Sequence, residues 1–283
     1  MTKQHIPKIR FQGFNDEWEK VNLSEIAPIR SGYSFKSKLF KDSGIPIVRI
    51  SNILSDGTVR GEFVFYDEIP NDNKYLLQGK SILIAMSGAT TGKVALLNSS
   101  EKYYQNQRVG YFKEKVDISF VYSILSTGNF VNQLSDVLVA GAQPNISAKD
   151  INNFNFLIPN TLPEQESIGQ IFRTLDDLIS AYKENLEHYQ SLKTSMLSKM
   201  FPKEGQKKPE IRLDGFDGDW EEKKLKDIAE FNPKSVIPNE FNYVDLESVI
   251  GTTLISHKRL SKDEAPSRAQ RTAKKNDIFF SNS

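Results

Sequence analysis

The amino-acid sequence predicts an α+β protein in which a mixed α/β domain is followed by a long coiled-coil-type helix and the start of a second, repeated α/β domain. Three observations lead to this fold class. Residues 1–159 contain short segments typical of strands and of helices. Residues 163–200 repeat an apolar residue every three or four positions. A segment near the beginning of the chain recurs 202 residues later.

Composition limits the classes of protein to which the chain can belong. Its 283 residues suffice for one large domain or two modest ones, and 38% hydrophobic residues suffice for a buried core. The sequence has no run of about 18 apolar residues, which a membrane-spanning helix needs, and no apolar signal-peptide core. The absence of Cys excludes disulfides and thiolate metal sites and favours a cytoplasmic protein.

Net charge argues weakly against a simple DNA-binding domain. The chain carries a net charge of +1, whereas most such domains are clearly basic. Any surface for nucleic acid must therefore be a local patch. The segment 258–275 holds seven basic residues against Asp263 and Glu264, and both a phosphate-binding surface and an ordinary solvated surface explain it.

Residues 1–159 are expected to form the first α/β domain. A turn is predicted at 141–145, after which Ser147 is expected to cap a helix. Strands are predicted at 45–53, 62–66, 81–86, 94–97, 109–112 and 154–158, and helices at 118–126 and 130–138.

Residues 160–202 are expected to form a long central helix with an apolar stripe. Pro163 and Glu164 suit a helix start, and Lys199 and Pro202 suit a helix end. The heptad-like spacing of the stripe favours a coiled-coil seam, although packing on a globular core explains the same pattern. The predicted interface with a partner helix comprises Ile168, Ile171, Leu175, Leu178, Tyr182, Leu186, Tyr189, Leu192 and Met196.

Residues 203–283 are expected to be an incomplete second copy of the first domain. Ten of the 21 positions in 7–27 are identical in 209–229, and both tryptophans of the protein are among them. A spacing of 202 residues is far longer than a solenoid period and indicates duplication of a whole domain. The second copy stops before it is complete, so a truncated or split protein is expected. The aromatic residues expected to anchor each domain to the helix are Phe14, Trp18, Phe216 and Trp220.

The segment 87–93, Ser-Gly-Ala-Thr-Thr-Gly-Lys, follows a predicted strand and looks like a phosphate-binding loop. It departs from the Walker pattern, because its glycines are too close together and Val94 stands where Ser or Thr would hold Mg²⁺. Thr90, Thr91 and Lys93 can instead offer two hydroxyl groups and one ammonium group to a DNA phosphate or base edge. A plain hairpin turn is the alternative.

A second polar motif, at 103–108, combines amide side chains with an arginine and two tyrosines. Asn and Gln can pair with adenine, and Arg can pair with guanine. The alternative is a polar strand entry whose amides satisfy buried backbone groups. The candidate DNA-binding residues from this motif and the later turn are Asn106, Gln107, Arg108, Gln143 and Asn145.

No chemistry of catalysis stands out in the sequence. A glycine-rich dinucleotide loop is absent, and so is the Asn-Pro-Pro-aromatic motif of amino-group methylation. The three histidines are far apart in sequence, and this spacing argues against a His-based metal site or catalytic triad. The sequence therefore predicts no catalytic residue and no metal ligand.

Taken in order, these motifs make the chain resemble the DNA-specificity (S) subunit of type I restriction–modification enzymes. The resemblance rests on the repeated segment from Pro-x-Ile-Arg to Trp-Glu, on the strand at 45–53 and on the Gly/Thr loop. It also rests on Ala-Gln-Pro-Asn-Ile-Ser at 142–147 and on Leu-Pro-Glu-Gln-Glu at 162–166, which leads into the heptad helix. It covers essentially the whole chain.

The resemblance implies a non-catalytic protein that reads DNA. Residues 1–159 would be a first target recognition domain for one half of a bipartite, gapped DNA target, and 203–283 an incomplete second one. The helix at 160–202 would separate the domains and dock the methyltransferase (modification) subunits, which a motor/nuclease (restriction) subunit joins for cleavage. S-adenosylmethionine and ATP are expected only on those partners. Another copy of the chain, as a homodimer, or the methyltransferase would cover the apolar stripe.

Three functions therefore stand side by side. The first is a sequence-reading, DNA-binding specificity subunit. The second is a coiled-coil protein-interaction adaptor without DNA readout. The third is an enzyme, either a phosphate-loop NTPase or a methyltransferase. They are distinguished by binding of DNA, of a protein ligand that DNA does not displace, or of ATP or S-adenosylmethionine.

Overall fold

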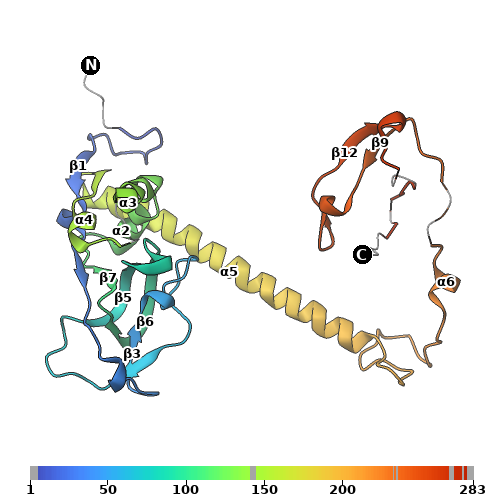
Figure 1. Ribbon diagram of the computed structural model, residues 1–283, viewed down its shortest axis with the longest axis horizontal. Helices are drawn as coiled ribbons and strands as arrows, with labels where there is room; N and C mark the ends of the chain where they lie inside the picture. Colours follow the sequence, from blue (N-terminus) through green and yellow to red (C-terminus); the bar gives the residue numbers. More distant parts are fainter. Residues whose placement is uncertain are drawn as a thin grey trace. The chain divides into compact units, whose positions relative to one another are not determined.

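The computed structural model describes residues 6–140, 145–231, 233, 235–267, 271–275 and 277–278. The chain divides into two compact units, Met1–His188 and Tyr189–Ser283. One long helix, α5 (Leu162–Met200), contributes residues to both units (Figure 1). This helix confirms the helical segment expected from the heptad-like spacing. The predicted turn at 141–145, including Gln143, lies almost entirely outside the described residues.

A six-stranded sheet forms the framework of the first unit (Figure 1). Its strand order is β2-β7-β5-β6-β3-β4. Neighbouring strands pair antiparallel except for β3 and β6, which are parallel. The strands are β2 (Ile29–Ser31), β3 (Ile45–Val48), β4 (Val64–Tyr66), β5 (Leu76–Ala85), β6 (Val94–Gln105) and β7 (Val109–Phe112).

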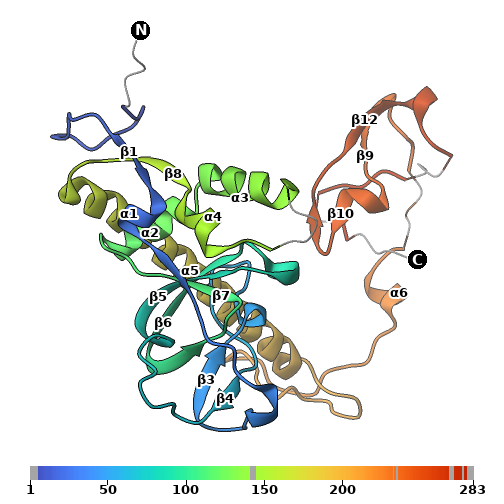
Figure 2. The ribbon, with the colours of Figure 1, turned by 60° about the vertical axis from the view of Figure 1, so that its left-hand side comes forward.

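Short helices cover one face of this sheet. Both views show α2 (Ile118–Leu125), α3 (Gly128–Ala140) and α4 (Ala148–Asn152) gathered at the same side of it (Figures 1 and 2). Successive strand residues point to opposite faces. Accordingly, Ile82 of β5 packs in the cluster under the helices, and Leu83 packs in a separate cluster on the other face.

The two ends of the first α/β domain pair with each other. Strand β1 (Glu19–Asn22) pairs antiparallel with β8 (Asn155–Ile158). The short helix α1 (Leu23–Ile26) follows β1 directly, and the Leu23 amide donates to the Phe154 carbonyl at 2.8 Å. Both Leu23 and Ile26 are buried, so the segment that opens the domain is part of its core.

Several element boundaries differ from those expected. The strand predicted at 45–53 ends at Val48 and gives way to a 3-10 turn, η2 (Ile50–Asn52). Buried Asn52 causes this change, because its side chain accepts from the Arg49 amide at 3.0 Å and donates to the Glu62 carbonyl at 3.0 Å. Strand β6 continues to Gln105, well past the predicted end at 97, because its polar second half is held by backbone pairing with β5. The other 3-10 turns of this unit are η1 (Ser37–Leu39) and η3 (Gly88–Thr90).

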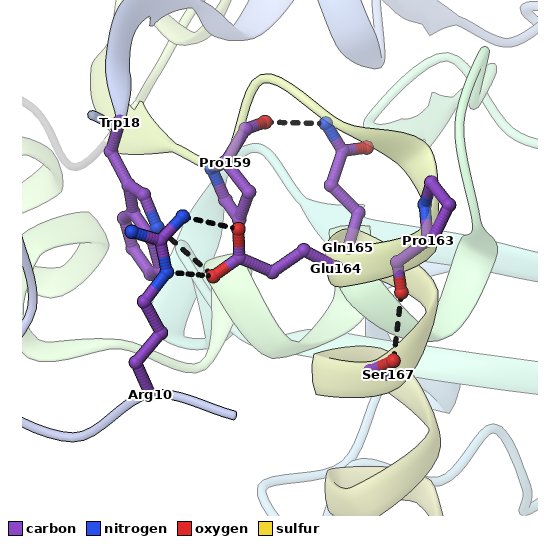
Figure 3. A network of polar contacts seen from close by, with 7 residues as sticks. All are labelled: Arg10, Trp18, Pro159, Pro163, Glu164, Gln165 and Ser167. Carbon is purple, nitrogen blue, oxygen red and sulfur yellow. Dashed lines mark hydrogen bonds and ion pairs between the residues drawn. The ribbon is translucent and has the colours of Figure 1, made fainter. Parts of the chain in front are cut away.

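The start of α5 is fixed to the first unit by a buried ion pair (Figure 3). Both Glu164 carboxylate oxygens accept from the Arg10 guanidinium at 2.7 Å, and one also accepts from the Trp18 indole N–H at 3.3 Å. The Glu164 side chain is only 1% exposed. Gln165 adds a buried hydrogen bond to the Pro159 carbonyl at 2.8 Å. The chain entry and the helix start are therefore joined by polar contacts across some 150 residues of sequence.

The second unit, Tyr189–Ser283, contains shorter elements. It contains α6 (Leu225–Ile228), which lies 202 residues after α1. Its two small antiparallel sheets pair β9 (Glu240–Tyr243) with β12 (Lys258–Ser261) and β10 (Val249–Ile250) with β11 (Thr253–Leu254). The described residues of this unit also form the 3-10 turns η4 (Leu246–Ser248) and η5 (Lys262–Glu264). Leu225 and Ile228 are exposed, in contrast to their counterparts in α1.

Because Tyr104 is buried, the stability of the first unit is expected to fall at alkaline pH. Its hydroxyl group donates to Asp72 and accepts from the Ile69 amide. Burial, followed by the Asp72 hydrogen bond, raises the pKa of Tyr104 to about 12 from the ordinary value of 10.0. The folded protein then holds this proton more tightly than the unfolded chain does, so the contribution is complete below pH 10 and falls as pH rises toward 12. Urea unfolding at several pH values should show this decline.

The Tyr104→Phe variant is the test of that assignment. It should be less stable at neutral pH and should lose less additional stability between pH 10 and 12 than the wild type. Tyr66→Phe is the matched control, because Tyr66 packs in the same aromatic cluster as Tyr104. A decline of equal steepness in wild type and Tyr104→Phe would contradict the assignment.

Candidate nucleic-acid interface

Three separate loops meet beside the ends of β5 and β7. The Met86 amide donates to the Arg108 carbonyl at 2.9 Å, and the Ile146 amide donates to the Met86 carbonyl at 3.0 Å. Ser87 and Asn145 form an isolated antiparallel bridge. A hollow of about 490 Å³ lies here, lined by Met86, Ser87, Gly88, Gln107, Arg108, Asn145 and Ile146. Three candidate residues that are distant in sequence, Gln107, Arg108 and Asn145, are thus brought together.

In the turn between β6 and β7, one side chain of the amide-rich motif bonds to the backbone, and two others are exposed to solvent. The Asn106 side chain accepts from the Arg108 amide at 3.2 Å, and its carbonyl accepts from the Val109 amide at 3.0 Å. Asn106 therefore shapes the turn, as the structural alternative expects. Gln107 and Arg108 are exposed, and in the described part of the chain neither side chain forms a hydrogen bond or an ion pair.

Gln105, which precedes the turn, is fully buried. Its side-chain amide donates to the Arg30 carbonyl at 2.9 Å and the Val109 carbonyl at 2.7 Å. These hydrogen bonds connect β2 and β7 to the end of β6. Gln105 therefore stabilises the turn that follows it. The sequence pattern alone could not separate Gln105 from Gln107, since both are glutamines in one polar run.

The Gly/Thr loop uses its hydroxyl groups internally. The Thr90 hydroxyl donates to the Ile50 carbonyl at 3.2 Å, and the Thr91 hydroxyl donates to the Gly88 carbonyl at 2.6 Å. Gly92 has a φ of +85°, and a Cβ there would lie 2.2 Å from the Leu134 side chain. Strand β6 begins directly after half-buried Lys93. The loop is therefore a tightly fastened hairpin connection, and Thr90, Thr91 and Lys93 lie outside the lining of the hollow.

Asn145 is exposed at the rim, three residues before the start of α4. The predicted cap is confirmed, because the Ser147 hydroxyl accepts from the Asp150 amide at 3.1 Å and the Asp150 carboxylate accepts from the Ser147 amide at 3.1 Å. This capping box fixes the direction in which the chain leaves the rim. Asn145 is thus held on a short, well-anchored connection.

Ser87 opens the Gly/Thr motif at 87–93 and lines this hollow, although it is not among the candidate DNA-binding residues of the sequence. Its hydroxyl group is buried and has no hydrogen-bond partner in the described part of the chain. The motif indicates a loop at Ser87 but does not single out its hydroxyl group, and only the pairing of Met86 with Arg108 and Ile146 places it here.

Arg30 is a structural arginine near the same strands. Its guanidinium lies 4.7 Å from the centre of the Tyr111 ring and donates to the Leu76 carbonyl at 3.0 Å. Burial lowers the pKa of Arg30 and raises that of Tyr111. Because its charge is partly desolvated and already bonded, Arg30 belongs to the framework, which leaves Arg108 as the cation at the hollow.

The described residues form neither a metal site nor a membrane-spanning helix. Among the described residues, no group of three or more His, Cys, Asp or Glu side chains is arranged to hold a metal ion. Across the same residues, no helix combines the length and apolar character that crossing a membrane requires.

Comparisons with known proteins address the family. Residues 15–188 match the family described as "Type I restriction modification DNA specificity domain". The chain is 29% identical over 195 residues to the type I restriction enzyme MjaVIII specificity subunit of Methanocaldococcus jannaschii, covering 65% of this chain and 45% of that protein. It is 30% identical over 174 residues to the EcoAI specificity subunit of Escherichia coli, covering 57% and 28%. The chain thus spans less than half the length of these relatives.

Solved structures of similar proteins were also found. The type I restriction–modification S subunit of M. genitalium is 18% identical, with a TM-score of 0.46, over 65% of this chain and 46% of that one. The HsdS subunit of Thermoanaerobacter tengcongensis is 17% identical, with a TM-score of 0.44, over 68% and 47%. Since the family match extends over more than half of the sequence, this chain belongs to the type I restriction–modification DNA specificity domain family.

Proposed function

We propose that the chain is a sequence-specific DNA-binding specificity subunit of a type I restriction–modification complex. In this proposal the first α/β domain reads one half of a bipartite, gapped target, and the chain itself is non-catalytic. The observation that carries the proposal is the hollow where exposed Gln107, Arg108 and Asn145 converge. The names of the relatives and of the matching family support it.

The chemistry of these three side chains suits base edges in a major groove. A guanidinium can donate two hydrogen bonds to guanine, and an Asn or Gln amide can both donate to and accept from adenine. Because the turn and the capping box fix the backbone around them, little ordering is needed when DNA binds. A small group of readers on rigid loops also fits the modest net charge of +1, since other subunits can supply phosphate contacts.

The test is a gel-shift measurement on the purified chain together with its methyltransferase partner. Target DNA should be taken from sites that the host methylates, and random DNA of the same length is the control. The target should bind more tightly at fixed salt concentration, because phosphate contacts alone do not discriminate between sequences. Equal affinity for both DNAs would contradict the proposal and favour the adaptor function.

The apolar stripe of α5 is proposed as the surface for partner subunits. Exposed fractions along it run from 45% at Ile171 to 75% at Tyr182, and such a contiguous apolar surface marks an interaction site. Leu175, Leu178, Leu186, Tyr189 and Leu192 fall within these limits. Ile168 instead packs on the core of the first unit, and Met196 is half-buried. Methyltransferase subunits, a motor/nuclease subunit or a second copy are the proposed partners, with S-adenosylmethionine and ATP bound only by the first two.

A charge placed on this stripe should weaken assembly. In Leu186→Glu the new carboxylate would have to be desolvated at the helix interface, so affinity for the methyltransferase should fall about tenfold. Glu184→Gln changes a charge at a nearby exposed position of α5 outside the apolar stripe and should leave affinity unchanged. Analytical ultracentrifugation of each variant with the methyltransferase measures the two affinities. Unchanged assembly of Leu186→Glu would remove the stripe from the interface.

A further inference from the structure

The repeated segment of the sequence occurs in two structural settings. In the first unit, Arg10 and Trp18 together grip the carboxylate of Glu164 at the start of α5 (Figure 3). The guanidinium binds both oxygens, an arrangement that is strong and directional. The first copy of the segment is thus a clamp for an acidic helix start.

The second copy retains the two side chains of the clamp. Arg212 and Trp220 stand 202 residues after Arg10 and Trp18. Within the described part of the chain Arg212 forms no ion pair, and its guanidinium donates to the Gly218 carbonyl. The Trp220 ring packs edge-on against Phe201 with ring centres 5.6 Å apart. Arg212 and Trp220, called here the second clamp, therefore offer the same hydrogen-bond donors as the first clamp, and within the described residues they bind no carboxylate.

A hollow adjoins this second clamp within the second unit. Its volume is about 490 Å³, and its lining comprises Lys193, Met196, Leu197, Met200, Phe201, Ile211, Arg212, Leu213, Phe216 and Trp220. Among the described residues that line it, all are apolar apart from two cations, and none carries a carboxylate. Leu213 and Phe216 are 64% and 63% exposed, which is costly for large apolar side chains in water. The hollow is therefore complementary to an apolar segment that carries a negative charge.

We propose that this hollow, with Arg212 and Trp220, is a docking site for the first turn of a partner α-helix that begins as α5 does, with Leu-Pro-Glu-Gln. The partner carboxylate pairs with the Arg212 guanidinium and the Trp220 indole N–H, and its apolar residues cover Leu213 and Phe216. An acidic residue is also the favoured charge at a helix start. A second folded copy of this chain does not supply this helix start, because Glu164 is 1% exposed and already bound by Arg10.

Fluorescence anisotropy can measure this docking directly. The probe is a labelled peptide with the sequence of residues 159–180, added to the full chain. Wild-type protein should bind it, and Arg212→Ala and Trp220→Ala should each weaken binding at least tenfold. A peptide carrying Glu164→Gln should bind as poorly to the unmodified protein, so the test holds even if a protein variant misfolds. Lys226→Ala, at an exposed cation of α6 outside the lining of the hollow, should leave peptide affinity unchanged.

Two outcomes would overturn the proposal. The first is peptide binding that survives Arg212→Ala but is lost in Arg10→Ala, since the peptide would then be displacing the start of α5 from the first clamp. The second is self-association of the full chain, measured by sedimentation, that both Arg212→Ala and Glu164→Ala abolish. The occupant would then be a second copy of the chain. Neither outcome would affect the DNA-binding proposal, which rests on a different surface.

Discussion

Gly169→Val is expected to lower the free energy of unfolding of the first unit by about 3 kcal/mol, because overpacking at a close contact forces the backbone to move. Gly169 is buried where α5 crosses the start of α2. A Cβ at this position would lie 2.4 Å from the Asp117 carboxylate oxygen and 2.6 Å from the Phe120 amide nitrogen. Those two atoms form the N-terminal cap of α2 at 2.9 Å, so any larger side chain also disturbs the cap.

Urea unfolding followed by circular dichroism measures this loss. Gly128→Ala is the matched control, because Gly128 is also the glycine of a helix, and a Cβ there meets no atom within 4 Å. That substitution should be neutral or slightly stabilising, since Ala favours helix over Gly. If Gly169→Val unfolds like the wild type, α5 does not pack on α2 as described.

Arg108→Ala is expected to weaken binding to the target DNA about 30-fold, which corresponds to one lost bidentate base contact. Arg108 is the cation of the hollow, and its guanidinium is exposed and uncommitted within the described part of the chain. Loss of a base contact should also relax the sequence preference at a single position of the target. Gel-shift titrations against targets with each base pair varied in turn measure both effects.

Arg173→Ala is the control for charge alone. Arg173 is an exposed arginine on α5 that donates to the Gln170 side chain at 2.8 Å, and its loss should leave the sequence preference unchanged. A uniform loss across all sequences in Arg108→Ala, with a shallower salt dependence, would assign Arg108 to a phosphate. That result would contradict base reading by Arg108.

The parts of the fold that follow from local sequence periodicity were predictable. Strand β7 has the predicted bounds, and α5 lies within the predicted 160–202, two residues shorter at each end. The polar half of β6 was not predictable, because pairing with β5 holds it in place of an apolar face. The end of β3 depended on Asn52, whose partners lie up to ten residues away in sequence.

The residue types of the candidate site could be predicted from the sequence. Which of these side chains bond to the protein's own backbone, and which remain exposed, could not. Thr90, Thr91 and Asn106 have side chains that suit DNA, yet the structure uses them to fasten loops. Gln107 and Arg108 have the same chemistry and are left outward. Which polar residues satisfy backbone groups depends on tertiary neighbours such as Ile50, and no sequence pattern encodes those neighbours.

The pairing of β1 with β8 has an evolutionary consequence. Because Glu19 lies opposite Ile158, the chain enters and leaves the first α/β domain at adjacent points. A domain with adjacent ends can be exchanged as a cassette by recombination without changing the geometry of what lies on either side. Under the proposed function, such an exchange would change the DNA sequence that is read in a single genetic event and would leave α5 as it was.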